Sequence, residues 1–571
     1  MLFKTGHPDR LLGLLALLLL AWFALAQLYL AMARSPSADD AMFLSVPKNW
    51  LNGYGWATSY SEKIPVNPDF TGPTALLWLA TPFIALFGHQ LWIAGLTGLL
   101  ANLALTAGCL LQLQRYWPRA GLAGFCLVCG LVASQPQDFA SLIGYYTGSL
   151  LFLLASLLAF DPQRTLVQRA ALVGVLAAIA LLVKLLLAPA FLLLALLMAG
   201  HSLLASTPGS RRHLPLACAA LLLPALLALG SWQLFREQQL AGYSDDYRAV
   251  HAGYGRQFFL YHGSGIGQWR DAPDKLHYVV RNVDRNLYFV EESLALHGIR
   301  NPWLGDAPAD EQHWFGSLFL LLLGTATLHA LARAMRDPAC WQYWWHSAMG
   351  LTVLAYLAWF LLLAMAMSPG HLFFPMQWVL WWLLLSVALL LARRVSLVQQ
   401  LGSAAVVLLA STQLLMPVES REQLLQWRHD MLIKADAMLE AATYLQQQQS
   451  NLPLAGCGYS GYPRHLEFLL PRSQNFADCL DLIEDHVAQD ADGHYHWRAP
   501  LAFNLVFSLQ TPGINTATGP VLNACKDNVL YRNSEVQVMA CRATDLQTLD
   551  LDRLMQEIHL HQRWYRTRLR P

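Results

Sequence analysis

Long apolar stretches separated by short polar connections fill most of the chain before residue 417. A helix needs about 20 apolar residues to cross roughly 30 Å of hydrocarbon. Runs close to that length cover residues 11–33, 91–113, 120–137, 140–160, 168–184, 186–206, 214–235, 314–333, 344–366, 371–392 and 396–416. The pattern therefore predicts a polytopic α-helical membrane protein with about 11 transmembrane helices.

A further apolar run, 74–88, is shorter and contains Pro82. Its length is more typical of an interfacial or re-entrant helix than of a span. If the run 74–88 does not cross the membrane, five arginine pairs lie on the same side of the membrane as Lys4 and Arg10. These pairs are Arg115/Arg119, Arg164/Arg169, Arg211/Arg212, Arg333/Arg336 and Arg393/Arg394. The positive-inside rule makes that side the cytoplasm, so 34–90, 236–313 and the segment after Met416 are expected to be exported.

The C-terminal part of the chain lacks the long apolar runs. Residues 418–449 have the pattern of an amphipathic helix, and 451–571 resemble a small α/β unit with strands near 504–508 and 536–539. We therefore expect a membrane domain over 1–416 and a periplasmic α/β domain over 417–571.

Four of the nine cysteines, at positions 457, 479, 525 and 541, lie in this C-terminal part. An even number in an exported domain predicts two disulfides. Sequence proximity favours Cys457–Cys479 and Cys525–Cys541, although four cysteines permit three pairings.

Composition supports a membrane protein and gives no sign of a nucleic-acid partner. The chain is 55% hydrophobic and 13% charged, whereas soluble proteins are about 25% charged. The net charge is +1, and neither a basic tract nor zinc-ligand spacing is present. The first apolar run is too long for the core of a signal peptide, so we read it as a retained span.

The first candidate for chemistry is the acid pair Asp39–Asp40, just beyond the first apolar run. Charge beside a membrane is costly to desolvate, which points to a function. The residues that follow have the pattern of an interfacial helix. Its apolar face comprises Met42, Phe43, Val46 and Trp50. The alternative is that the pair caps this helix, although capping accounts for one carboxylate better than for two.

A cation inside an apolar run is the second candidate. Lys184 lies near the outer end of the run 168–184, where an ammonium group is suited to binding a lipid phosphate. Snorkelling to the interface is the alternative. His371, in the outer turn before the tenth span, is a further candidate donor to phosphate, or an ordinary interfacial histidine.

Weaker candidates for substrate binding lie in segments expected on the outer side. Asp138, Tyr145 and Tyr146 lie around the outer turn between the third and fourth spans, where Asp138 could instead be a turn or capping residue. Asp69 lies in the first exported loop. Arg256 and Arg270 alternate with aromatic residues in 236–313, a pattern suited to sugar and phosphate contacts or to an ordinary solvated surface.

These features together resemble the GT-C superfamily of integral-membrane glycosyltransferases, which includes the lipid A aminoarabinose transferase, protein mannosyltransferases and arabinofuranosyltransferases. The similar stretch runs from Asp39–Asp40 through 52–55 to 71–73. Lys184 and the segment 368–375 extend the similarity, although the family often has an arginine where this chain has His371. The C-terminal part resembles no family that we can name.

The resemblance implies an inverting transfer of a sugar from a polyprenyl-phosphate carrier to a periplasmic glycan, lipid or protein, at the bacterial inner membrane. It implies Asp39 as the base, and Asp40 as a residue that orients the acceptor or binds a divalent cation such as Mg²⁺ or Mn²⁺. Lys184 and His371 would bind the donor phosphate. The alternative function is a flippase for lipid-linked sugars or another transporter, but the internal repeats and broken helices typical of transporters are not evident in the sequence.

Overall fold

The computed structural model describes residues 7–33, 37–53, 55–56, 74–116, 120–133, 139–142, 144–161, 163–183, 188–205, 213–241, 273–277, 419–448, 452–456, 464–470, 476–509 and 518–558. The chain divides into two compact units, each built from separate segments. The first combines residues 1–29, 98–234 and 264–422, and the second combines 30–97, 235–263 and 423–571. The second unit thus joins the first loop to the C-terminal segment, whereas the sequence had grouped that loop with the membrane domain.

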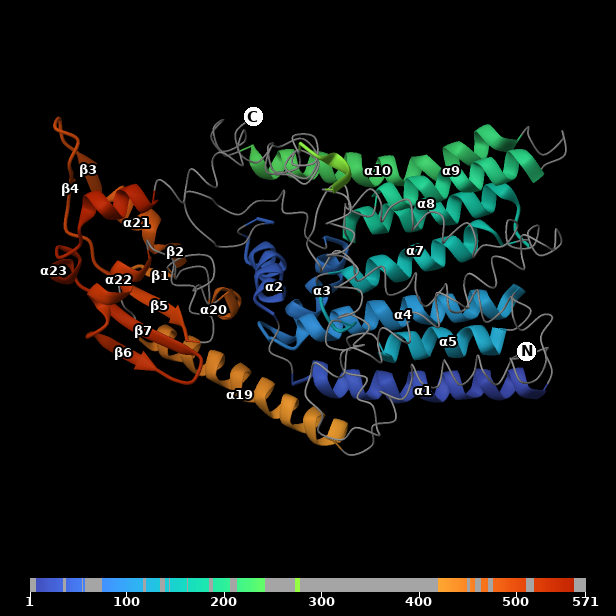
Figure 1. Cartoon of the computed structure of the whole chain (residues 1–571), viewed down its shortest axis with the longest axis horizontal. Helices are drawn as coiled ribbons and strands as arrows, with labels where there is room; N and C mark the ends of the chain where they lie inside the picture. The colour runs from blue at the N-terminus through green and yellow to red at the C-terminus, as the bar shows by residue number, and fades with distance from the viewer. Residues whose placement is uncertain are drawn as a thin grey trace. The chain divides into compact units, whose positions relative to one another are not determined.

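The helices of the first unit match the apolar runs of the sequence. They are α1 (His7–Ala31), α4 (Ile93–Tyr116), α5 (Ala120–Ala133), α7 (Tyr145–Ala159), α8 (Leu166–Val183), α9 (Ala188–Ala205) and α10 (Leu214–Leu240), and Figure 1 draws them with nearly parallel axes. Four of the described helices are long and apolar enough to cross a membrane: residues 9–31, 93–115, 166–183 and 214–238. The chain is therefore a multi-pass membrane protein, and the four runs beyond residue 313 lie outside the described residues.

Small residues let these helices approach closely. A Cβ added to Gly174 of α8 would lie 2.5 Å from the carbonyl oxygen of Leu221 in α10, and one added to Gly108 of α4 would lie 3.3 Å from Leu154 of α7. Larger side chains at either glycine would push neighbouring helices apart.

Polar contacts show which helix ends lie together. The backbone N–H of Gly121, at the start of α5, donates to Oδ2 of Asp9 near the start of α1 (3.1 Å). The end of α4 precedes α5 by only a few residues, so α4 ends where α1 begins. α1 therefore ends, and α4 begins, at the opposite end of these helices.

This arrangement bears on α3 (Thr74–Phe87), a helix of 14 residues that contains Pro82. At 1.5 Å per residue it is about 21 Å long, less than the ~30 Å hydrocarbon core. Because the segment between α1 and α4 starts and finishes at the same end, α3 cannot be a lone crossing. However, α5 also has 14 residues, so length alone does not separate α3 from a span, and a non-spanning α3 stays a prediction.

One arginine from each of two pairs, Arg115 and Arg164, lies at one end of the bundle. Asp161 follows α7 and is fully buried. Its Oδ2 accepts from Gln112 Nε2 of α4 (2.6 Å) and from Arg164 Nε (3.0 Å), and Arg115 Nε lies 3.9 Å away. The connections after α4 and after α7 thus lie at the same end, as the arginine pattern predicted. That this end faces the cytoplasm remains a prediction.

The C-terminal part of the second unit is a small α/β structure, as expected. Its five-stranded sheet has the order β2-β1-β5-β7-β6. The strands are β1 (Leu454–Gly456), β2 (Phe476–Asp478), β5 (Phe503–Ser508), β6 (Val529–Arg532) and β7 (Val536–Cys541). β1 pairs in parallel with β2 and β5, whereas β7 pairs antiparallel with β5 and β6.

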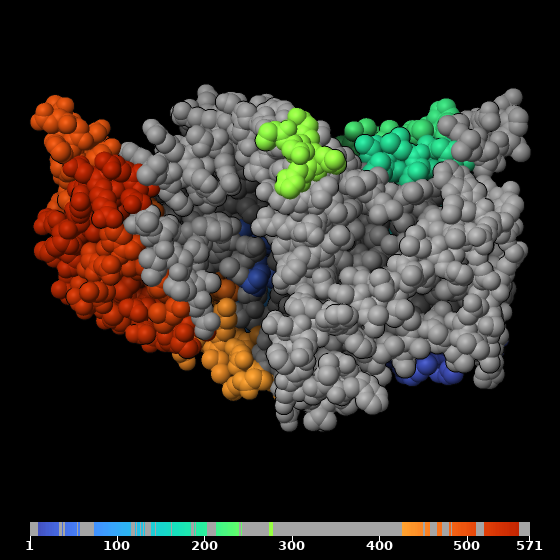
Figure 2. All heavy atoms as spheres, in the orientation of Figure 1, coloured from blue at the N-terminus to red at the C-terminus, as the bar shows by residue number. Residues whose placement is uncertain are grey.

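Helices surround this sheet, and a hairpin extends from it. The helices are α19 (Glu419–Gln447), α20 (Arg464–Leu469), α21 (Cys479–Asp485), α22 (Thr518–Cys525) and α23 (Ala543–Leu546). β3 (Val487–Gln489) and β4 (Tyr495–Trp497) form the hairpin, whose tip is exposed. Figure 2 shows atoms of this C-terminal part as a continuous orange-to-red surface.

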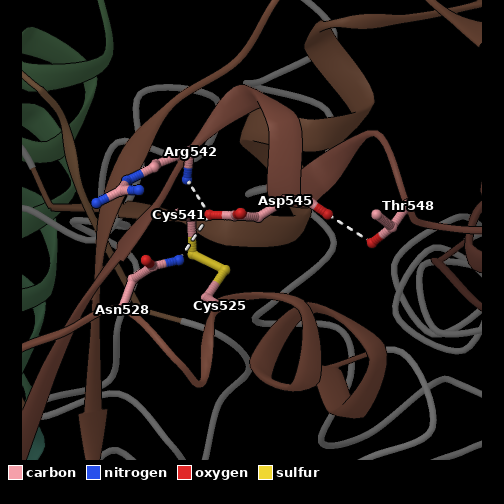
Figure 3. The surroundings of a disulfide bond; sticks show 6 residues. All are labelled: Cys525, Asn528, Cys541, Arg542, Asp545 and Thr548. Atoms are coloured by element: carbon pink, nitrogen blue, oxygen red, sulfur yellow. Dashed lines mark hydrogen bonds between the residues drawn. A yellow bond between two sulfur atoms is a disulfide. The ribbon is translucent and has the colours of Figure 1, made fainter.

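A disulfide between Cys525 and Cys541 joins α22 to β7, as sequence proximity predicted. Beside it, a carboxylate oxygen of Asp545 accepts from Asn528 Nδ2 (2.8 Å) and from the backbone N–H of Arg542 (3.1 Å) (Figure 3). Cys479 is also disulfide-bonded. Its predicted partner, Cys457, lies outside the described residues.

Candidate functional site

The acid pair lies in the first turn of α2 (Ala38–Leu51), which begins a few residues after α1 ends. The N-cap is Ser37, whose side-chain oxygen accepts from the backbone N–H of Asp40 (3.1 Å). The capping role is therefore filled by a serine, the residue type that suits it well. Asp40 is the third residue of the helix, a position where the helix dipole favours a negative charge. The catalytic role of the acid pair stays a prediction.

Asp40 is fully buried. A carboxylate at such a position is costly to desolvate, so its presence calls for a compensating structural or chemical role. Asp39 occupies the preceding position of the same helical turn. The structure therefore places the two predicted catalytic residues in one helical turn, with Asp40 buried.

The burial of α2 differs from the sequence expectation of an interfacial helix. All ten residues from Asp40 to Asn49 are buried, including Leu44 and Lys48 on the face opposite Met42 and Phe43. The expected apolar face is buried except for Trp50 at its end, which is 36% exposed. The opposite face is covered as well, because α2 packs against both α3 and α20 of its own unit.

The buried cation Lys48 links α2 to α20, and sequence reasoning did not single it out. Its Nζ donates to the backbone carbonyl of Glu467 (2.5 Å) and to that of Leu470 (2.8 Å). Carbonyls at a helix C-terminus lack partners within the helix and carry the negative end of its dipole, so an ammonium group suits them. In the sequence, Lys48 is the first cation after the acid pair. Its place in the same predicted helix was the one feature that could have marked it as a candidate.

A histidine lies next to this contact. The ring of His89, between α3 and α4, is 5.6 Å from the ring of Phe468 in α20. Burial, with a smaller contribution from the charge of Lys48, lowers the pKa of His89 below its usual value. The imidazole is therefore neutral at pH 7 and adds no second positive charge beside Lys48.

The C-terminal end of α2 lies in an aromatic cluster formed by Trp50, Trp56, Trp78 and Phe235. Trp56 stacks on Trp78 with ring centroids 4.6 Å apart, and Trp50 packs edge-on against both rings at 6.0 Å. Trp78 is 44% exposed. Partly exposed tryptophans are typical of the membrane–water interface. The ring of Phe235 lies 5.6 Å from that of Trp50 and completes the cluster.

One candidate near the fourth span, Tyr146, has a structural role in the first unit. Tyr146 is buried, with its ring 5.8 Å from that of Phe139. Asn102 of α4 donates to the carbonyl of Phe139 (2.7 Å) and accepts from Thr147 Oγ1 (2.8 Å). Packing therefore accounts for Tyr146 without a substrate, and its substrate role stays a prediction. Tyr145 lies in the first turn of α7.

The other predicted site residues lie outside the described residues. They are Asp69, Asp138, Lys184, Arg256, Arg270 and His371. Their assigned roles stay predictions. Within the described ranges, no group of three or more His, Cys, Asp or Glu side chains could hold a metal ion, so the described residues near Asp40 do not by themselves form a metal site.

Comparison with known proteins identifies the fold. No protein-family model matches the chain, and no curated protein matches its sequence. Its structure is similar to that of ArnT from Cupriavidus metallidurans bound to undecaprenyl phosphate, with a TM-score of 0.55 and 14% identity over 93% of this chain and 98% of that one. The apo structure of the same protein gives a TM-score of 0.44 at 12% identity, with the same coverage. The similarity to the first of these structures shows that the chain has an ArnT-like fold, which agrees with the resemblance inferred from the sequence.

Proposed function

We propose that this protein is a glycosyltransferase of the bacterial inner membrane that takes a sugar from a polyprenyl-phosphate carrier. The observation that carries the proposal is the acid pair in the first turn of α2, with Asp40 fully buried and Ser37 already acting as the cap. The similarity to ArnT supports the class of donor, because ArnT was crystallised with undecaprenyl phosphate.

In the proposed reaction, a hydroxyl oxygen of the acceptor attacks the anomeric carbon of the donor sugar. A new C–O bond forms while the bond between the anomeric carbon and the phosphate oxygen breaks. The phosphate departs with the bonding electrons as polyprenyl phosphate, and the proton of the hydroxyl passes to Asp39. A single displacement of this kind inverts the anomeric centre and needs one positioned base.

Asp40 is proposed to hold the acceptor or Asp39 in position from its buried place in the same turn. Cations stabilise a departing phosphate, and Lys184 and His371 are the proposed donors to it. The proposed steps use no metal ion. Dialysis against EDTA tests this point, since a loss of transfer that Mg²⁺ or Mn²⁺ restores would add a divalent cation to the role of Asp40.

The proposal includes an orientation. Residues 34–90, 236–313 and 417–571 are proposed to face the periplasm, where a periplasmic glycan, lipid or protein would be the acceptor. Arg115 and Arg164, which meet Asp161 at one end of the bundle, would then lie at the cytoplasmic end. Labelling of a cysteine introduced at position 118 by a periplasmic reagent would contradict this orientation.

The test is the release of free polyprenyl phosphate, the product common to every acceptor. Purified protein in lipid nanodiscs is incubated with a panel of undecaprenyl-phosphate sugars and an envelope extract as the source of acceptor. We expect release with at least one donor, together with transfer of label from the sugar to the extract. Movement of intact donor across the bilayer without release would instead establish a flippase and refute the proposal.

A further inference from the structure

The contact between α2 and α20 joins parts of the chain that are far apart in sequence. Nζ of Lys48 and the carbonyl of Glu467 are separated by 419 residues, yet they lie 2.5 Å apart. Lys48 is 1% exposed, and its second acceptor, the carbonyl of Leu470, lies 2.8 Å away. A buried ammonium group with two short charge-assisted hydrogen bonds defines one position of α2 against α20.

The lysine lies on the helix that carries the acid pair. Asp40 and Lys48 are eight positions apart, which is about 12 Å along a helix axis. Ser37 caps the other end of α2 (3.1 Å), and every residue between Asp40 and Lys48 is buried. A shift at Lys48 would therefore move the turn that holds Asp39 and Asp40.

Among the described residues, the neighbouring His89 adds no positive charge beside Lys48. His89 is held neutral by burial and by Lys48 itself, which lower its pKa. His465 and Glu467 of α20 are buried. If the ammonium group were removed, the carbonyls of Glu467 and Leu470 would each lose a buried donor, a situation that favours local rearrangement.

We propose that Lys48 is a positioning residue that holds the acid-bearing helix on the C-terminal domain, so that this domain sets the geometry of sugar transfer. The inference rests on the proposed function, and it gives the C-terminal domain a role that the sequence did not indicate. The domain then acts as part of the catalytic framework and does not need to bind either substrate.

The test compares Lys48→Met with Lys48→Arg, and uses Lys526→Met as the control because Lys526 is exposed at the end of α22. Hydrogen exchange in full-length protein reports on the contact, and steady-state transfer reports on its consequence. Lys48→Met should speed exchange in peptides covering 38–51 and 464–470 and leave 503–541 unchanged. A misplacement near 1 Å costs up to about 10²-fold in rate, so we expect kcat to fall about 10- to 100-fold and the donor KM to change less than ~3-fold.

Lys48→Arg keeps a charge and several donors, so it should recover part of the lost kcat. Lys526→Met should match the wild type in both measurements. Unchanged exchange at 38–51 in Lys48→Met would overturn the inference, as would faster exchange with normal kcat. If the wild type transfers no sugar, the proposed function and the catalytic consequence fall together, while exchange still shows whether Lys48 holds α2 on α20.

Discussion

The disulfide between Cys525 and Cys541 offers a prediction with a calculable magnitude. The two cysteines are 16 positions apart, and closing a loop of ~15 residues stabilises a fold by about 3 kcal/mol through the entropy of the unfolded chain. Both side chains are buried in the core below the sheet. Replacing both by alanine should therefore destabilise the C-terminal α/β structure by about 3 kcal/mol or somewhat more, because small cavities add to the entropic loss.

Hydrogen exchange measures this loss directly in the intact protein. Amides of β5 and β7 exchange when the sheet opens, so 3 kcal/mol corresponds to exchange on the order of 10²-fold faster. Cys218→Ala is the matched control, because Cys218 is a free, exposed cysteine of α10. We expect it to leave exchange in β5 and β7 unchanged.

An acceleration below about 3-fold in the double variant would refute the loop-entropy argument for this sheet. Counting thiols in non-reduced protein provides an independent check. Free thiols at Cys525 and Cys541 would contradict the disulfide and, with it, the export of this domain to an oxidising compartment.

Three further predictions concern other parts of the molecule. Asn102→Ala removes the hydrogen-bond partner of the Phe139 carbonyl and of the Thr147 hydroxyl. It should lower the free energy of unfolding by about 1–3 kcal/mol in a detergent unfolding assay. A change below ~0.5 kcal/mol would contradict the importance of this buried network. Asp552 raises the pKa of His494 above its usual 6.5 through a 2.8 Å contact. This contact should therefore stabilise the folded state at low pH, and the contribution should be lost as the pH rises through the raised pKa of His494. NMR titration should show that Asp552→Asn lowers this pKa, and no change would refute the pairing. Lys184→Met should raise the donor KM at least ~10-fold if this cation binds the phosphate. An unchanged KM would indicate that the Lys184 side chain instead snorkels to the interface.

The sequence predicted best those features that depend on local pattern. Helices α1, α4 and α8 follow apolar runs, because burying a span in lipid requires little more than length and hydrophobicity. The strand β5 and the disulfide at Cys525 were likewise found from short-range signals. The helix α3 was likewise expected from its apolar run, and its non-spanning character stays a prediction from its length and from the arginine pattern.

Prediction failed where a distant part of the chain supplies the environment. The pattern of α2 indicated lipid on one face and water on the other, but α20 and α3 cover the helix. The carbonyls that bind Lys48 lie more than 400 positions away, and no local periodicity can reveal them. For the same reason the sequence gave no sign that α2 packs against α20.

The candidate site was predicted in part. Asp39 and Asp40 were identified from their place after the first apolar run, and the structure adds that Ser37 takes the capping role and that Asp40 is buried. Lys48 was missed because a single lysine in an amphipathic helix is ordinarily solvated. Tyr146 was selected by position alone, whereas its ring packs against Phe139.

Sugar transfer by acid-pair variants is the most direct test of the central claim. Asp39→Asn keeps the size of the side chain and removes the proton acceptor, so transfer should fall by about 10²–10⁴-fold. Asp40→Asn should also lower transfer, and Asp436→Asn, at an exposed position of α19, is the matched control. Each variant is expressed at equal level, and release of polyprenyl phosphate is measured in membranes. The account predicts a large loss for both site variants and none for the control, whereas near-normal transfer by the double variant Asp39→Asn/Asp40→Asn would contradict it.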